Sequence, residues 1–132
     1  MLLADGADGP YPVDPVRLMK GAFLAVERGQ PEWKGLFDFR AYDYGPFDRA
    51  VYDARDALVR RSYLEVTSGR YERYELTSAG VSRAASLREE HGANADWIRR
   101  IGRYVSTRSF SQLLEEIYAA YPRFRARSLF RS

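Results

Sequence analysis

The sequence predicts an α+β, mostly helical fold: a winged helix-turn-helix with a helical C-terminal extension. Three consecutive signals between Tyr44 and Gly80 predict it, namely an amphipathic helix, a short β-hairpin and the capped start of a second helix. At 132 residues the chain is long enough for one domain with a sizeable core. We expect a single domain over 1–132, with a winged-helix core over 14–90 and a basic helical extension over 94–132.

The expected recognition helix starts at Gly45-Pro46, because glycine permits a sharp turn and proline suits the first helical position. Apolar residues then recur at spacings of three and four, which places them on one face of a helix. Arg60 and Arg61 close the last turn, where cations interact favourably with the helix dipole. The apolar positions are Phe47, Ala50, Val51, Ala54, Ala57 and Leu58.

The hairpin is expected from two alternating, aromatic-rich runs, residues 63–67 and 71–76. They are joined by three residues that include Gly69, which is typical of a tight β-turn. Thr77 is a suitable N-cap for the next helix. We expect helix and hairpin to share one core with two upstream aromatic residues. Its members would be Phe23, Phe39, Phe47, Val51, Leu58, Leu64 and Leu76.

Four further elements are expected around this unit. Asp14 caps a helix that begins with Pro15, and residues 37–42 alternate as a short strand. A later helix begins with Asn94 or Asp96 as its cap, and Ser109 and Gln112 fit the capping box of a last helix. The first thirteen residues, rich in glycine, proline and aspartate, predict a frayed helix end and a loop.

Several classes of function find no support in the residues. The chain has no cysteine and a single histidine, which argues against thiolate or histidine metal sites and against a catalytic triad. Phosphate-binding and dinucleotide-binding glycine motifs are absent, so we expect a non-enzyme without catalytic residues, metal or cofactor. No apolar run approaches the length of a membrane span, and we expect a cytoplasmic protein.

The charge is uneven along the chain. Residues 1–96 carry 13 Lys and Arg against 16 Asp and Glu, a net −3, whereas residues 97–132 carry eight Arg against Glu115 and Glu116, a net +6. Such a basic region can bind nucleic acid or an acidic protein, or it can be a solubilising surface. The candidate basic patch, with few acidic neighbours in the sequence, is Arg99, Arg100, Arg103, Arg123, Arg125 and Arg127.

Candidate DNA-binding residues lie on the recognition helix and the hairpin. Arginine can read guanine edges and grip phosphates. However, Asp48, Asp53 and Asp56 on the same helix repel phosphates and can pair with its arginines at helical spacing. Glu72 and Glu75 similarly balance the hairpin arginines, so a solvated pair of strands is an equal alternative. The candidates are Arg49, Tyr52, Arg55, Arg60, Arg70 and Arg73.

Three segments resemble the YwgA-like family of small prokaryotic proteins: residues 37–66, 74–80 and 113–128. The corner at Tyr44-Gly45-Pro46 is also similar, more distantly, to the SocA-like (Panacea) antitoxin domain. The resemblance implies a winged-helix-like α+β domain with a helical C-terminal extension. Two departures are the short helical start at residues 1–4 and the loop before Met19. A native start upstream of Met1, or a partner that completes the core, would account for them.

The expected function is DNA binding as a transcriptional regulator or accessory factor, with double-stranded DNA as partner and a homodimer as the assembly. The alternative is a protein-interaction module, antitoxin-like or adaptor, on the same fold without DNA binding. The hairpin and the basic C-terminal region favour the first function, and the aspartates of the helix favour the second.

Overall fold

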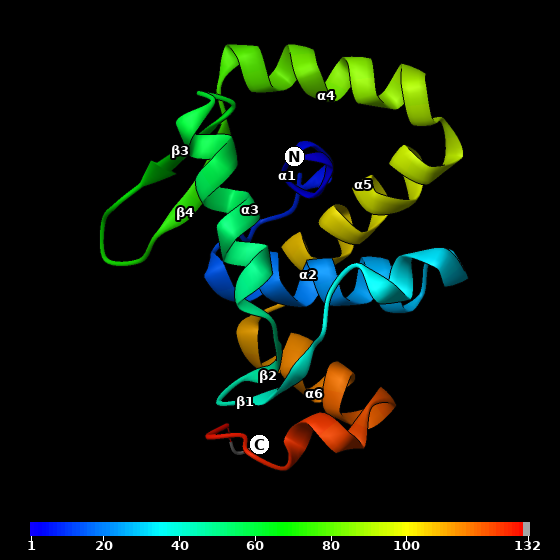
Figure 1. The fold of residues 1–132 in the computed structure, drawn as a ribbon. Helices are drawn as coiled ribbons and strands as arrows, with labels where there is room; N and C mark the ends of the chain where they lie inside the picture. The colour runs from blue at the N-terminus through cyan, green and yellow to red at the C-terminus, as the bar shows by residue number, and fades with distance from the viewer. Residues whose placement is uncertain (131–132) are drawn as a thin grey trace.

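The computed structural model describes residues 1–130, and it is mostly helical with two small antiparallel sheets (Figure 1). The expected α+β class is confirmed. Its α-helices are α1 (Leu2–Gly6), α2 (Pro15–Glu27), α3 (Arg49–Arg60), α4 (Ser78–His91), α5 (Ala93–Ser106) and α6 (Phe110–Ala120). The strands are β1 (Arg40–Tyr42), β2 (Gly45–Phe47), β3 (Leu64–Thr67) and β4 (Arg73–Leu76), and the 3₁₀ helices are η1 (Pro31–Gly35) and η2 (Pro122–Arg125).

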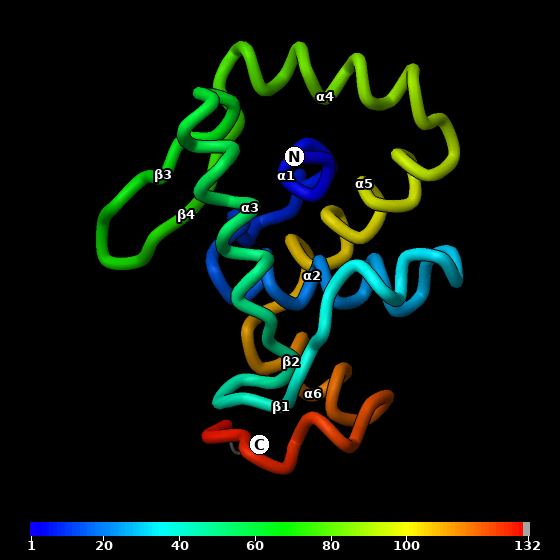
Figure 2. The backbone as a smooth tube through the Cα atoms, viewed as in Figure 1, coloured from blue at the N-terminus to red at the C-terminus, as the bar shows by residue number. Residues whose placement is uncertain are grey.

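The main core is built between α2 and the C-terminal helices α5 and α6. Leu24, Val105 and Leu114 are almost completely buried there, and Leu3 of α1 joins them. The backbone trace shows α2 crossing the middle of the molecule, with α5 above it and α6 below it (Figure 2). The helices expected to form an extension over 94–132 therefore supply a large part of this core.

Phe23 of α2 is the centre of an aromatic cluster that ties distant segments together. Its ring meets those of Phe39, Tyr121 and Phe124 edge to face, with centroids 5.2, 5.0 and 5.0 Å apart. Edge-to-face pairs at such distances add to the stabilisation that burial provides. The cluster fixes the chain before β1 and the 3₁₀ helix η2 onto α2.

The expectation of one shared core is wrong for the hairpin. Leu64 and Tyr74 form a second buried cluster with Val13, against which Leu58 and Leu76 pack. The reason is that β3–β4 stands at the side of the helices, and the segment before α2 fills the space beneath it. The amide N of Tyr74 donates to the carbonyl O of Val13 at 2.8 Å, so this segment also pairs with β4.

The predicted start of the recognition helix at Gly45-Pro46 is wrong. Those residues belong to β2, which pairs with β1 in the register Ala41 to Pro46. Gly45 has φ +93°, a left-handed value that favours glycine and forms the sharp turn of this hairpin. The helix starts three residues after Pro46, at Arg49, and the Asp48 side chain caps it by accepting from the amide N of Ala50. Asp48 is therefore a cap instead of an outward residue on the helix.

Three predicted caps are confirmed, and one is wrong. The side chains of Asp14 and Thr77 accept from the amide N of Arg17 and Gly80, and Ser109 and Gln112 form the capping box of α6. The start of α5 has no side-chain cap, because Gly92 turns the chain with φ +49° directly from α4 into α5. A one-residue connection leaves no room for Asn94 or Asp96 before the helix.

The first residues are not a frayed helix end. Helix α1 packs closely on α5: a Cβ built on Gly6 would lie 2.0 Å from the carbonyl O of Arg99, and one on Gly102 would lie 2.1 Å from that of Leu3. The Asp5 carboxylate pairs with Arg88 of α4 and Arg99 of α5 at 2.5 and 2.7 Å. Two glycines and one carboxylate thus allow α1 to sit among α4, α5 and β4.

Candidate functional site

Helix α3 and the β3–β4 hairpin are neighbours, in the order expected of a recognition helix and its wing (Figure 1). The amide N of Tyr63 donates to the carbonyl O of Leu58 at 3.0 Å and sets the turn between them. The element before α3 is the β1–β2 hairpin, and among residues 1–130 the nearest preceding helical turn is η1. A helix directly ahead of α3, as a helix-turn-helix requires, is thus absent from the described chain.

Arg55 and Tyr52 make contacts between α3 and the β3–β4 hairpin. The Arg55 guanidinium donates to the Tyr74 hydroxyl at 3.0 Å and pairs with Asp56 at 3.0 Å, and its Cζ lies 4.5 Å from the Tyr52 ring centroid. Burial alone would lower the pKa of Arg55, but the hydrogen bonds with Tyr74 and Asp56 raise it above its usual value. Burial raises the pKa of both tyrosines. These side chains attach α3 to the hairpin.

The other candidate residues on α3 and the hairpin are exposed. Arg49 reaches Asp53 at 3.9 Å, and Arg73 reaches Glu75 at 3.9 Å, which are loose pairs on the surface. The expected pairing of arginine with aspartate at helical spacing is confirmed for Arg49. Arg60 is exposed, and within residues 1–130 it has no carboxylate partner.

Arg70 and Arg73 border a groove of about 900 Å³ between the hairpin loop and the segment before α2. Tyr11 and Phe110 also line it, and the Arg70 guanidinium lies 5.6 Å from the Tyr71 ring centroid. Asp14 and Glu72 are among the lining residues as well. The hairpin arginines thus face mixed charge.

The basic patch divides into two parts. Arg99 and Arg103 pair with Asp5 and Asp8 at 2.7 and 3.1 Å, so the acidic N-terminal segment neutralises them. The expectation that these arginines have few acidic neighbours is wrong, because the fold brings the first eight residues onto α5. Arg100 is exposed and lies 5.8 Å from the Trp97 ring centroid.

The second part of the patch follows Pro122 and lies at the opposite end of the molecule, near β1 and β2 (Figure 2). Arg123, Arg125 and Arg127 are exposed, and each guanidinium lies over an aromatic ring, at 4.6, 5.4 and 5.4 Å from the centroid. None of the three has a carboxylate within ion-pair distance among residues 1–130. Arg123 lies over the neighbouring Phe124, whereas Arg125 and Arg127 lie over Tyr118 of α6 and Tyr42 of β1.

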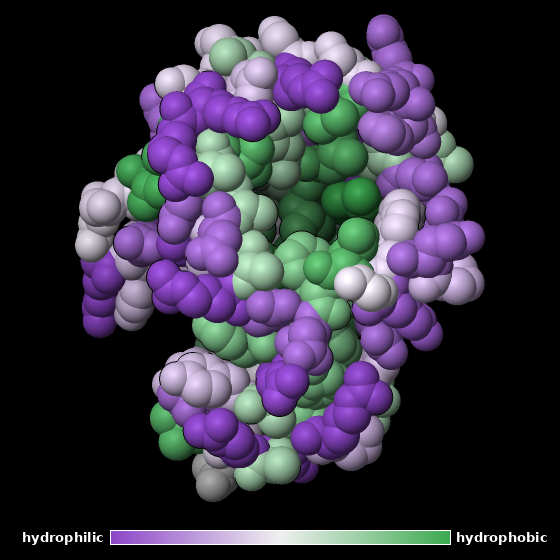
Figure 3. Space-filling model, in the orientation of Figure 1, coloured by the Kyte–Doolittle hydropathy of each residue, from purple (hydrophilic) through white to green (hydrophobic). Residues whose placement is uncertain are grey.

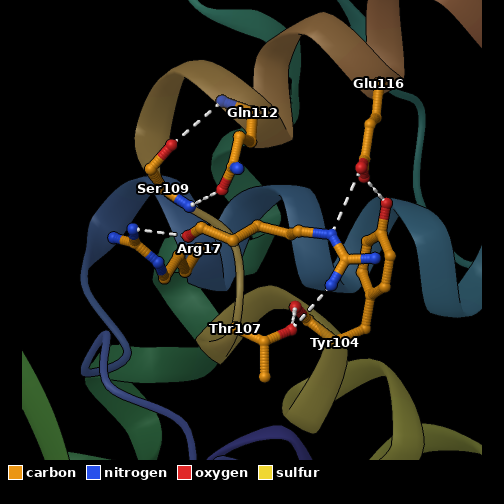
Figure 4. Close-up of polar contacts among 7 residues, drawn as sticks. Arg17, Tyr104, Thr107, Ser109, Gln112 and Glu116 are labelled. Carbon is orange, nitrogen blue, oxygen red and sulfur yellow. Dashed lines mark hydrogen bonds and ion pairs between the residues drawn. The ribbon is translucent and has the colours of Figure 1, made fainter.

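The turn between α5 and α6 is held by polar contacts (Figure 4). The buried Arg17 of α2 donates to the carbonyl O atoms of Val105 and Arg108 at 3.1 and 2.9 Å. The Glu116 carboxylate accepts from Arg108 at 3.2 Å and from the Tyr104 hydroxyl. Arg17 satisfies carbonyl groups where α5 ends, and Arg108 and Tyr104 bind the Glu116 carboxylate of α6, so these residues have a structural function.

One face of the molecule contains a hollow lined by hydrophobic side chains (Figure 3). It lies between α3 and α5, with α4 above, α2 below and α1 behind it (Figure 1). The helices around it carry apolar side chains that are only half-buried. Among them are Leu2, Ala50, Ala57, Leu58, Ala85, Leu87 and Ile98.

Helix α3 turns a small-residue face to this hollow. Arg55, Asp56 and Val59 border a pocket together with Val66 of the hairpin, which fixes one side of the helix. Ala50, Ala54 and Ala57 recur at spacings of four and three, and this spacing puts them on the side of the helix opposite Arg55, Asp56 and Val59. Ala54 is exposed although it belongs to the apolar set of the helix. The sequence pattern marked this face as core, and the fold leaves it open.

Lys20 of α2 is a buried cation. Its side chain is 4% exposed, and its Nζ donates to the carbonyl O of Pro46 at 3.2 Å, which anchors β2 to α2. Burial lowers its pKa from 10.5 to about 7. Sequence reasoning missed this residue, since a single lysine in an amphipathic helix gives no signal of burial.

The pH dependence of stability is expected to report on Lys20. Between about pH 7 and 10 the unfolded chain holds a proton that the folded chain has lost, so stability rises with pH in this window. Below it both states are protonated, and the folded state bears the full cost of burying the charge. Lys20→Met should remove this rise, as measured by thermal melts of both proteins across the window. Parallel curves for the two proteins would contradict the assignment.

Two further findings concern residues 1–130. None of their helices has the length and apolarity to cross a membrane. No group of three or more His, Asp or Glu residues in this part of the chain is arranged to hold a metal ion.

Comparison with protein families, curated proteins and solved structures finds no match.

Proposed function

We propose that the protein is a protein-interaction module, antitoxin-like or adaptor in type, that receives an α-helix of a partner protein in its apolar hollow. The observation that carries the proposal is the open apolar face of α3 beside this hollow. Contiguous exposed apolar surface in a protein otherwise rich in surface charge is typical of an interaction site.

The shape of the hollow favours a helix as the occupant. Its walls are themselves helices, and grooves between helices bind the apolar face of an amphipathic helix. Ala50, Ala54 and Ala57 have short side chains, and the distance between packed helix axes shrinks with the side chains at their contact. A partner helix can thus approach the α3 backbone closely.

The charges of α3 support the same function. Arg55 is hydrogen-bonded to Tyr74 and ion-paired with Asp56, and Arg49 lies beside Asp53. The helix therefore offers little free positive charge to phosphates. Affinity for DNA depends largely on that charge. A neutral helix with an apolar side is better suited to a protein surface.

The test places a photo-crosslinking amino acid at position 54 in cells that express the protein. We expect a discrete adduct with one partner, which is then purified and titrated against the wild type. Ala54→Arg inserts a charge into the hollow and should weaken binding at least about tenfold. Val59→Arg is the matched control, because Val59 is an exposed apolar residue of the same helix, 37% exposed, that borders the pocket on the hairpin side.

The identity of the crosslinked adduct shows which molecule occupies the hollow. An adduct between two copies identifies the partner as a second chain, and light scattering then gives the homodimer directly. If position 54 yields no discrete adduct, or if Val59→Arg weakens binding as much as Ala54→Arg, the hollow is not the interface.

DNA binding is the second candidate function. It is favoured by six of the predicted arginines, which are exposed and lack carboxylate partners within residues 1–130: Arg60, Arg70, Arg100, Arg123, Arg125 and Arg127. Replacing Arg123, Arg125 and Arg127 with serine should weaken binding to all duplexes alike and flatten the dependence of affinity on salt. A salt-titrated duplex-binding assay measures both. Undetectable binding of the wild type at low salt rules this function out.

A further inference from the structure

A second site is assembled at the end of the molecule where β1, β2 and the C-terminal segment lie together (Figure 1). It is a pocket of about 310 Å³, near the lower end of the size range of small-molecule sites. Arg40 of β1, Arg49 of α3 and Arg127 beyond η2 all line it. Three arginines from segments up to 87 positions apart, 40 to 127, thus line one pocket.

Two aromatic rings lie in the same pocket. Tyr42 and Phe47 have ring centroids 5.0 Å apart at an interplanar angle of 32°, and Tyr42 is 44% exposed. The Arg127 guanidinium lies 5.4 Å from the Tyr42 ring centroid. An exposed contact of this kind is weak, so a planar ligand can replace it.

The two carboxylates of the pocket are already satisfied. Asp38 accepts from the Arg40 Nε and Nη2 at 2.9 and 2.8 Å. Asp48 accepts from the amide N atoms of Ala50 and Asp38 at 2.9 and 2.7 Å.

Two guanidinium groups therefore remain for a ligand. Arg49 has only Asp53 at 3.9 Å, and Arg127 has no carboxylate partner in the described chain. Guanidinium groups bind phosphate through paired, charge-assisted hydrogen bonds.

We propose that this pocket binds a nucleotide: a phosphate monoester carried on a planar base. Arg49 and Arg127 take the phosphate, and the base stacks on the exposed ring of Tyr42, where it replaces the Arg127 guanidinium. Stacking of a base on an aromatic side chain is largely independent of the identity of the base. The ligand is a free nucleotide or the 5′-phosphorylated end of a strand, which share this chemistry.

Titration calorimetry of the purified protein with AMP tests the proposal. AMP should bind at least about tenfold more tightly than adenosine or inorganic phosphate, because each of these lacks half of the contacts. Arg49→Gln and Arg127→Gln should each weaken AMP binding about tenfold. Tyr42→Ala should weaken it similarly, whereas Tyr42→Phe keeps the ring and should bind like the wild type.

Arg123→Gln is the matched control, since Arg123 is an exposed arginine of the same segment that stacks on Phe124 outside the pocket. All altered side chains are exposed, and melting curves verify that each variant folds. If Arg123→Gln weakens binding as much as Arg127→Gln, the attraction is non-specific and the site is refuted. Absence of AMP binding below about 1 mM also refutes it.

A short single strand with and without a 5′ phosphate distinguishes the two sources. Tighter binding of the phosphorylated strand than of AMP assigns the pocket to strand ends. Binding of AMP alone assigns it to the free nucleotide. Either result requires the same loss with Arg127→Gln.

Discussion

Phe23→Ala is expected to lower the free energy of unfolding by about 3–5 kcal/mol. The ring is 1% exposed and touches Phe39, Tyr121 and Phe124 edge to face, so its removal leaves a cavity and ends three aromatic contacts. These contacts attach the chain before β1 and the 3₁₀ helix η2 to α2. Chemical denaturation followed by circular dichroism measures the loss.

Tyr71→Ala is the control for this variant, because its ring is 73% exposed in the hairpin loop. Its effect should stay within about 0.5 kcal/mol. A loss below about 1 kcal/mol for Phe23→Ala would mean that the aromatic cluster does not form around α2.

Gly102→Ala is expected to destabilise the protein by about 2 kcal/mol or more. The new Cβ would lie 2.1 Å from the carbonyl O of Leu3, a backbone atom that can yield only if α1 moves away from α5. Overpacking of this kind destabilises a protein by about 3 kcal/mol in severe cases, and the higher helix propensity of alanine offsets only about 1 kcal/mol of that loss. Thermal and denaturant unfolding measure the difference.

Two further glycine variants test the same contact and provide a control. Gly6→Ala should act in the same direction, since its Cβ would lie 2.0 Å from the carbonyl O of Arg99 on the other side of the same contact. Gly35→Ala should be near neutral, because nothing lies within 4 Å of that Cβ. A stable Gly102→Ala protein would show that α1 does not pack on α5.

The candidate residues for DNA binding could be listed from the sequence, but their partners could not. The near neutrality of the helix is visible in its alternating Arg and Asp residues. That Arg55 turns inward to Tyr74 depends on the hairpin folding back beside α3, a contact across 19 positions. Likewise, Arg99 and Arg103 look unpaired until α1 brings Asp5 and Asp8 against α5.

Local sequence signals correctly predicted where several helices and strands form. The caps at Asp14, Thr77 and Ser109 bond within three residues, so their side chains decide helix starts wherever the helices finally pack. The apolar spacing over 47–58 likewise predicted the helix α3, and the alternating runs predicted β3 and β4.

Only the tertiary structure decided which apolar face is covered. The alanines of α3 have the same spacing as a core face, yet α3 stands away from α5 and leaves them open to the hollow. Conversely, Lys20 of α2 is buried, although nothing in the sequence around it indicates burial. Periodicity fixes which side chains share a face, because it follows from the geometry of one helix. What lies opposite that face depends on contacts between segments far apart in the chain, which no local pattern encodes.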